Sequence, residues 1–433
     1  MEIKDFKAHR QQLMAALPEG SVAMLFAARE CTRSNDTEYH FRQNSDFFYL
    51  TGFNEPDAVL LLRPGQTPES VIFVRPTDKL AEIWHGRRLG VEAAPEALQL
   101  DVAFSLDEMG ELLPDLVNGA DTLAWLPGQA SYSDEAVSAL MATLRAGFRQ
   151  GRRAPTKQLD LRAQLHEMRL HKSDAEVALM ARAGEISAKA HVRAMQACRP
   201  GLYEYQLEAE INHECAIHGA RFMAYNSIVG GGVNACILHY TENEAQLNDG
   251  DLVLIDAGCE LDGYAADITR TFPVNGRFSE EQRALYALVL EAEKTAISLL
   301  RPGISIKEAN DRVLIILVSG LVALGILEGE VEALIEQEAY KAFYMHGLGH
   351  WIGIDVHDVG DYHTADRTRP LEPGMVLTIE PGLYIGPDAE VEARWRGIGI
   401  RVEDDVLITE EGHRVLTAGV PKEIDEIEAL MAG

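Results

Sequence analysis

Two stretches of the chain share one pattern: GDLVLIDAG at residues 250–258 and GMVLTIEPG at residues 374–382. Both begin and end with glycine, and Asp256 and Glu380 occupy the same place in the two copies. The tripeptide RPG at residues 199–201 returns at residues 301–303, in both places between two segments with helical patterning. Because both kinds of match occur in the same order, they predict two copies of a helix–helix–strand unit. Such copies usually pack about a pseudo-twofold axis, with a site between them.

Length and composition bound the class of protein. The 433 residues are enough for two domains, and the proportions of hydrophobic (47%) and charged (25%) residues are typical of a soluble globular protein. The formal net charge of 39 − 68 = −29 predicts repulsion from nucleic acid and from anionic membrane surfaces. The strongly apolar run at residues 313–327 is shorter than the roughly 20 residues of a membrane-spanning helix. The five scattered cysteines predict reduced thiols in a cytoplasmic protein without a secretory signal.

The chain is predicted to be α/β (α+β), with a small N-terminal α/β domain over residues 1–170 and the repeat in a second domain over 171–433. Short apolar runs mixed with helical stretches favour the first domain. The polar, proline-containing stretch 150–160 is predicted to be a linker. Capping boxes at residues 173–176 and 279–282 predict the starts of two helices.

The first copy of the repeat predicts a pair of acids on one hairpin. The dipeptide Asp-Gly at 262–263 is a strong signal for a two-residue turn after the strand-like run 252–255. In that register Gly258 pairs with Asp267, and Asp256 becomes its diagonal neighbour on the same face, with Cα atoms roughly 7–8 Å apart. Two carboxylates so placed repel each other and lose hydration. A cation between them removes both costs.

The second copy predicts a matching pair. In GIGIRVEDD, residues 397–405, Arg401 and Glu403 alternate onto the face opposite the isoleucines. If this strand returns beside the strand that ends at Glu380, Glu380 and Glu403 face each other. This pair spans twelve more residues than the first, which predicts an inserted loop around residues 386–397.

The stretch HGLGH at 346–350 adds histidines to the four acids. Its two glycines argue against a zinc-binding helix, so we expect an irregular or extended segment. His350 would complete five ligands, and oxygen ligands with one nitrogen suit divalent ions such as manganese, cobalt or iron. Two such ions roughly 3.5–4 Å apart can share and deprotonate a water, which is then the nucleophile. Taken singly, each acid also fits an ordinary turn or a solvated strand face.

These residues lie in stretches that resemble the pita-bread metallopeptidases. Within that group the whole chain is similar to the Xaa-Pro aminopeptidase (aminopeptidase P) family, and the resemblance extends into the first domain. The stretches that carry it are 252–272, 346–358, 377–385 and 397–405, followed by 33–56 and 82–90 in the first domain. The resemblance implies an aminopeptidase P-type domain at 1–170, a pita-bread catalytic domain at 171–433, and two divalent ions, manganese first, with cobalt, iron or zinc as alternatives.

The resemblance also implies roles for individual residues. The implied metal ligands are Asp256, Asp267, His350, Glu380 and Glu403, all of which are present. Implied catalytic residues are Glu380 as general base, His239 and His357 beside the reacting peptide, and Arg401 beside the last carboxylate. Implied substrate-binding residues are His346, Tyr225 and Trp84, together with Asp36, an acid that would reach the site of a neighbouring subunit.

The implied activity is hydrolysis of the first peptide bond of Xaa-Pro-Yaa peptides through a metal-bridging hydroxide. A homo-oligomer, dimer or tetramer, follows from the same resemblance, and neither nucleic acid nor membrane is expected as a partner. Two alternatives stay open: a prolidase acting on Xaa-Pro dipeptides, and a non-catalytic peptide-binding module on the same fold. Loss of metal acids is typical of the latter class, and this chain keeps all of them.

Overall fold

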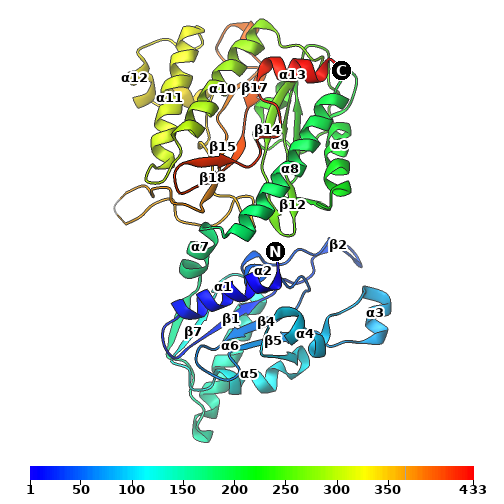
Figure 1. Ribbon diagram of the computed structural model, residues 1–433, viewed down its shortest axis with the longest axis vertical. Helices are drawn as coiled ribbons and strands as arrows, with labels where there is room; N and C mark the ends of the chain where they lie inside the picture. Colours follow the sequence, from blue (N-terminus) through cyan, green and yellow to red (C-terminus); the bar gives the residue numbers. More distant parts are fainter. Residues whose placement is uncertain (366) are drawn as a thin grey trace. The chain divides into compact units, whose positions relative to one another are not determined.

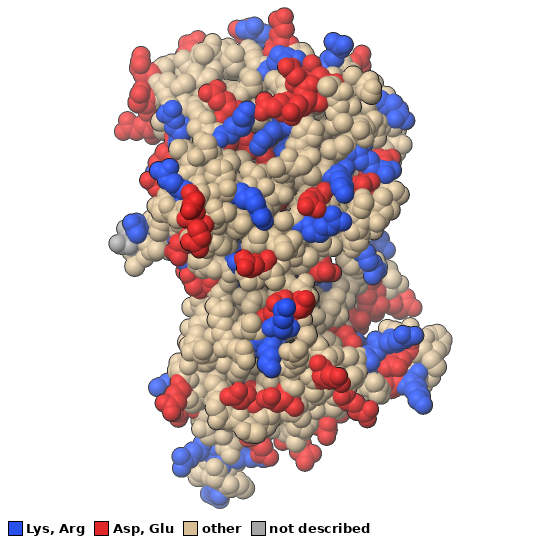
Figure 2. Space-filling view, in the orientation of Figure 1, with Lys and Arg blue, Asp and Glu red and all other residues tan. Residues whose placement is uncertain are grey.

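The computed structural model describes residues 1–365 and 367–433. The chain divides into two compact units, residues 1–168 and 169–433, and each has helices packed on strands (Figure 1). The predicted mixture of helices and sheets is confirmed. Acidic and basic side chains are interspersed on the face of each unit shown in Figure 2. Among the described residues, no helix combines the length and the apolar character that crossing a bilayer requires.

The first unit is built on a six-stranded mixed sheet with the strand order β6-β5-β4-β1-β7-β8. Strands β1, β4 and β5 are buried along their whole length, as their unbroken apolar sequences lead one to expect. The strands are β1 (Ser21–Phe26), β4 (Val59–Leu62), β5 (Ser70–Val74), β6 (Val102–Ser105), β7 (Thr122–Trp125) and β8 (Lys157–Asp160), with a separate hairpin of β2 (Thr32–Ser34) and β3 (Thr37–Glu38). The helices are α1 (Ile3–Ala16), α2 (Ser45–Thr51), α3 (Lys79–His85), α4 (Gly90–Leu98), α5 (Met109–Val117), α6 (Ser131–Ala146) and α7 (Arg162–Leu170).

The prediction of a linker at 150–160 is wrong for the second half of that stretch. Residues Lys157–Asp160 form β8, which pairs in parallel with β7 at the edge of the sheet. Most residues of β8 are exposed. An edge strand with a solvated surface needs no apolar pattern, so its sequence is as polar as that of a loop.

The second unit contains the predicted repeat of paired helices. These are α8 (Asp174–Ala197), α9 (Glu204–Ile217), α10 (Glu280–Leu299) and α11 (Ile306–Ala323), and the RPG tripeptides lie between the members of each pair. Both capping boxes are confirmed, because Ser173 and Ser279 accept hydrogen bonds from the third backbone N–H of their helices. In Figure 1, α8 and α9 lie on one side of the strands, and α10 and α11 on the other.

Small antiparallel sheets form the strand layer in the described part of this unit, with the orders β10-β11-β14, β13-β12-β9, β15-β18-β19 and β16-β17. Helix α8 packs on β12 and β13, and α10 packs on β15 to β17. The strands are β9 (Phe222–Met223), β10 (Ile228–Gly231), β11 (Leu252–Asp256), β12 (Cys259–Leu261), β13 (Tyr264–Ala265), β14 (Thr269–Pro273), β15 (Val376–Ile379), β16 (Gly382–Ile385), β17 (Ile398–Arg401), β18 (Asp404–Ile408) and β19 (His413–Val415). Two short helices complete the unit, α12 (Val331–Glu336) and α13 (Ile424–Met431).

The first hairpin has the predicted register. Leu261 pairs with Tyr264 across the two-residue turn, and Asp256 pairs with Thr269 further along. The same register sets Gly258 opposite Asp267. A Cβ on Gly258 would lie 1.7 Å from the carbonyl oxygen of Ala266, so only glycine allows the two chains to approach this closely.

The second hairpin is confirmed as well. Ile379 pairs with Asp404 and Gly382 with Arg401, a register that sets Glu380 directly opposite Glu403. Residues 386–397, between β16 and β17, are the inserted loop. An antiparallel bridge between Thr269 and Glu403 joins the first hairpin to the second, so acids from both copies of the repeat come together.

Candidate active site

A cavity of about 570 Å³ in the second unit collects most of the residues singled out from the sequence. It is lined by all five predicted metal ligands and by His239, His346, His357, Arg401 and Tyr225. The rest of the wall includes the aliphatic side chains of Ile228, Leu238 and Val356 and the polar side chains of Asn226 and Thr241. The cavity therefore offers charged, titratable and apolar surface within one enclosure.

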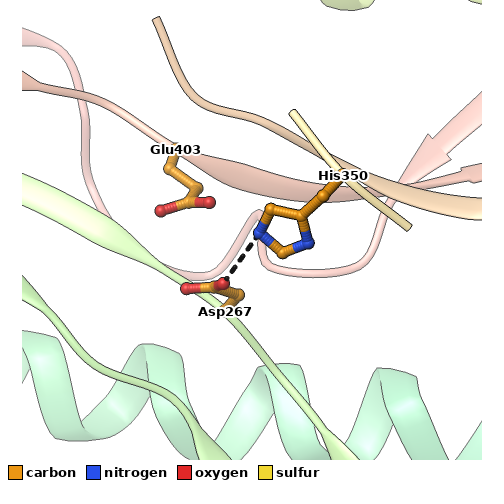
Figure 3. A group of neighbouring side chains, drawn as sticks. All are labelled: Asp267, His350 and Glu403. Atoms are coloured by element: carbon orange, nitrogen blue, oxygen red, sulfur yellow. Dashed lines mark ion pairs between the residues drawn. The ribbon is translucent and has the colours of Figure 1, made fainter. Parts of the chain in front are cut away.

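Three predicted ligands face one another most closely. Ligand atoms of Asp267, His350 and Glu403 all lie within 4.8 Å of one another, and Figure 3 shows the three side chains pointing to a common centre. His350 Nδ1 lies 3.0 Å from the carbonyl oxygen of Trp351, which directs Nε2 toward Asp267 Oδ2 at 3.5 Å. Burial lowers the pKa of His350, but the hydrogen bond and charge of Asp267 outweigh burial and raise it to about 9. The imidazole thus stands where a cation is favoured.

The segment that carries His350 is irregular, as predicted, and lies along β15. The backbone N–H of Thr378 donates to the carbonyl of His350 at 2.9 Å, and that of Glu380 donates to the carbonyl of Leu348 at 2.8 Å. A Cβ on Gly349 would meet the Thr378 carbonyl oxygen at 1.9 Å, whereas one on Gly347 would meet nothing within 4 Å. Gly349 therefore lets the histidine segment contact the strand that ends at Glu380.

Asp256 and Asp267 stand on either side of one phenol. The Tyr225 hydroxyl lies 2.6 Å from Asp256 Oδ1 and 2.5 Å from Asp267 Oδ1. Burial, with the negative charge of Asp267, raises the pKa of Asp256 to about 6. Tyr225 is thus in contact with two predicted ligands. Its predicted role in binding substrate stays a prediction.

The two glutamates are buried against their own strands. Thr378 Oγ1 lies 3.3 Å from Glu380 Oε1, and Thr269 Oγ1 donates to Glu403 Oε2 at 2.5 Å. Burial raises the pKa of Glu380 to about 7 and that of Glu403 well above its usual range. The positive charge of Arg401 lowers both pKa values, and that of His350 lowers the pKa of Glu380, but burial and the neighbouring acids outweigh these effects. The residues present therefore fit a divalent cation, which would supply further positive charge.

Arg401 connects the acids to a histidine. Its Nη2 donates to Asp256 Oδ2 at 2.6 Å, and its Nη1 donates to the Tyr384 hydroxyl at 2.9 Å. That hydroxyl lies 2.8 Å from His346 Nε2, while His346 Nδ1 lies 2.8 Å from the carbonyl oxygen of Gly347. Burial lowers the pKa of His346 to about 4, so the ring is neutral and both of its nitrogens are engaged.

Sequence reasoning missed Tyr384 and Thr269. Both contact Arg401, and Thr269 also contacts the predicted ligand Glu403. A signal was available for Tyr384. It is a residue with a hydroxyl between two apolar residues, in the strand that follows Glu380. Thr269 lies two residues after Asp267 and therefore on the same face of its strand.

His239 and His357 occupy the open part of the cavity. Both are exposed, and neither has a hydrogen-bond partner in the described portion of the chain. The ring of His357 meets the ring of His350 edge-on, with centroids 4.4 Å apart. Exposed imidazoles without hydrogen-bond partners can interact with a molecule that enters the cavity.

Two predicted substrate-binding residues belong to the first unit. Asp36 lies in the turn between β2 and β3, and Trp84 lies on α3. Both side chains are exposed, Trp84 to 77%. Their assignment to a substrate site stays a prediction.

Comparison with known families identifies the class. The pattern of metallopeptidase family M24 matches residues 178–410, more than half of the chain, and that of the aminopeptidase P N-terminal domain matches residues 6–125. The chain therefore belongs to metallopeptidase family M24, and the family recognised from its motifs is confirmed.

Individual relatives are similar over nearly the whole length. The chain is 57% identical over 430 residues to the Xaa-Pro aminopeptidase of Escherichia coli (strain K12), covering 99% of this chain and 97% of the relative. It superposes with a TM-score of 0.98 on proline aminopeptidase P II from Yersinia pestis, at 58% identity and 100% coverage of both chains. A zinc-substituted E. coli aminopeptidase P in complex with product also gives 0.98, at 56% identity, covering 100% of this chain and 98% of that one.

Proposed function

We propose that this metallopeptidase removes the first residue from peptides with proline in the second position. The observation that carries the proposal is the convergence of five ligand-type side chains in one cavity that also contains three further histidines and an aliphatic surface. The near full-length similarity to enzymes named Xaa-Pro aminopeptidase supports the choice of substrate.

Two divalent ions would be held by Asp256, Asp267, His350, Glu380 and Glu403. Manganese is our first choice, with cobalt, iron or zinc as alternatives, because one imidazole among carboxylates suits hard or borderline ions. When bound, the ions would lower the pKa of a shared water and supply the hydroxide nucleophile. The raised pKa values of Asp256, Glu380 and Glu403 support this ion count, since one dication together with Arg401 leaves net negative charge among four buried carboxylates.

The remaining residues bind the peptide and move protons. Glu380 acts as the general base, because its carboxylate lines the cavity among the proposed ligands and would lie beside the attacking water. His239 and His357 donate hydrogen bonds to the carbonyl oxygen as negative charge develops on it. His346 is engaged at both nitrogens, so His357 is the better candidate to deliver a proton to the proline nitrogen. Arg401 keeps Asp256 oriented through their 2.6 Å contact.

Selectivity for proline follows from its missing N–H. An amide formed by proline cannot donate a hydrogen bond, so a site that requires this donor rejects it. The aliphatic wall of Ile228, Leu238 and Val356 can instead bury the pyrrolidine ring.

We further propose a cytoplasmic homo-oligomer, a dimer or tetramer. All five cysteines are free thiols, which suits a reducing compartment. Helix α3 exposes Leu80 to 69% and Ile83 and Trp84 to 77% each, an apolar surface that association would cover. In such an assembly Asp36 and Trp84 could serve the site of a neighbouring subunit.

Metal rescue on matched peptides tests the function. Enzyme treated with chelator is assayed with and without manganese on Arg-Pro-Pro, on Arg-Ala-Ala and on the dipeptide Arg-Pro. We expect manganese-dependent release of arginine from Arg-Pro-Pro only. Faster cleavage of Arg-Pro would identify the prolidase alternative, and equal rates on the two tripeptides would refute proline selectivity. Tight peptide binding without turnover at any metal concentration would favour the non-catalytic module.

A further inference from the structure

The loop 231–245 sets the place of His239. It follows β10, passes through the 3-10 helix Gly232–Cys236 and carries His239 on its exposed side. Because the imidazole has no hydrogen-bond partner among the residues that the structure describes, its position depends on the backbone of this loop. The next residue, Tyr240, is only 7% exposed and turns inward. Whatever anchors Tyr240 and the ends of the loop therefore fixes His239.

One carboxylate makes these anchoring contacts. Glu204, the first residue of α9, is fully buried. Its Oε1 accepts hydrogen bonds from the N–H of Gly231 at 2.7 Å and from Asn234 Nδ2 at 3.0 Å. Its Oε2 accepts from the Tyr240 hydroxyl at 2.8 Å and from the N–H of Ala245 at 2.8 Å.

The four donors bracket the histidine. Two of them precede His239 in the sequence and two follow it, so the carboxylate of Glu204 ties both arms of the loop to one point. All four donors are neutral, and hydrogen bonds to a charged acceptor are stronger than neutral ones. Tyr240 also packs in a small cluster with Ile228 and Tyr384, and Tyr384 is the residue that contacts Arg401 and His346.

We infer that Glu204 is a positioning residue that holds His239 against the cavity. It does not line the cavity and touches no predicted ligand. The inference rests on the proposed function, because it assigns the buried carboxylate an effect on turnover through His239. Without such a role, four neutral donors could be satisfied by a smaller and less polar arrangement.

Glu204→Gln is the informative substitution. The amide has nearly the volume of the carboxylate, but its NH₂ group donates and cannot accept. It must face two donors, either Gly231 and Asn234 or Tyr240 and Ala245. Since a displacement of about 1 Å can cost about 10²-fold in rate, we expect kcat/KM on Arg-Pro-Pro to fall about 10- to 100-fold. Stabilisation by manganese should be unchanged, because the ligands are untouched.

The matched control is Glu210→Gln on the same helix. Glu210 is half-exposed and pairs with Arg193 at the surface, so its amide variant should keep kcat/KM within about twofold of wild type. If wild type and control both fail to cleave Arg-Pro-Pro, the proposed function is wrong and the inference falls with it. If both are active and Glu204→Gln is equally active, the inference alone is overturned.

A double-mutant cycle separates positioning from general structure. In a His239→Ala background the imidazole is gone, so adding Glu204→Gln should cost less than about twofold more. An undiminished 10- to 100-fold loss in that background would show that Glu204 acts by another route. If Glu204→Gln does not fold, Tyr240→Phe replaces it in the cycle. That variant removes one donor, and its smaller loss of about three- to tenfold must also vanish without His239.

Discussion

In the metal-free protein, Glu380→Gln should increase stability while abolishing turnover. Burial raises the pKa of Glu380 from 4.5 to about 7. The folded state therefore holds this proton more tightly than the unfolded state does. Binding of this proton therefore adds to the free energy of unfolding. The contribution is complete below pH 4.5 and is lost as the pH rises through 7. Glutamine mimics the protonated acid and cannot ionise, so the variant keeps that stability.

The size of the effect follows from the pKa. The difference between about 7 and 4.5, at about 1.4 kcal/mol per pH unit, corresponds to about 3 kcal/mol. Metal-free Glu380→Gln should thus exceed wild type by about 3 kcal/mol at pH 8 and match it at pH 4. Manganese at 100 times its Kd should nearly cancel this difference, because it adds about 2.7 kcal/mol to the protein that binds it.

Urea unfolding with chelator at pH 4, 6 and 8 measures this difference. Glu410→Gln is the control, because Glu410 is an exposed acid whose substitution should shift the free energy of unfolding by no more than about 0.5 kcal/mol at any pH. Equal stability of wild type and Glu380→Gln at pH 8 would contradict the reasoning. So would a gain that persists undiminished at pH 4, where the wild-type acid is already protonated.

Two further substitutions test contacts that support the site. Lys172→Met removes one of the two cations on the buried carboxylate of Asp358 and leaves Arg169, so the free energy of unfolding should fall by less than the roughly 3–5 kcal/mol expected for a fully unpaired buried charge. Arg182→Met, at an exposed pair, should change it by less than about 1 kcal/mol. Gly349→Ala forces a Cβ against a backbone carbonyl and should abolish manganese-dependent activity on Arg-Pro-Pro. Gly347→Ala is the control, because its Cβ meets no protein atom within 4 Å and the variant should remain active. Equal activity of the two variants would refute the packing argument.

Local signals in the sequence predicted the hairpins well. The turn at 262–263 and the alternation of apolar residues fixed the register of Asp256 and Asp267, because side-chain direction in a strand has a period of two. The second pair followed from the repeat, and the structure sets Glu380 opposite Glu403. The glycines of 346–350 correctly excluded a helix.

Contacts between distant segments were beyond this reasoning. Tyr225, predicted beside the substrate, contacts two acids that lie 31 and 42 residues away. Tyr384 and Thr269 gain their importance only when the two hairpins meet at Arg401. Nothing in a period-two pattern says which of several polar residues on a face will find a partner across the repeat.

The same limit explains the error at β8. Its four residues gain their strand conformation from pairing with β7, although most of their side chains remain in solvent. A polar sequence beside a proline then has no feature that separates it from a connection. The expected roles of Asp36, at the site of a neighbouring subunit, and of Trp84, beside the substrate, stay predictions.

The two acid-bearing hairpins differ in how freely they can change length over evolution. The Asp hairpin closes in two residues, so an insertion there would shift the pairing that sets Asp256 against Asp267. The Glu hairpin already carries residues 386–397 beyond a stem whose register is held by β16 and β17. New sequence inserted at the exposed residues 392–394 can therefore change this loop while Trp395 stays in the core and the register of Glu380 and Glu403 is kept. This asymmetry marks that loop as the place where members of such a lineage can diversify and where an engineer should begin.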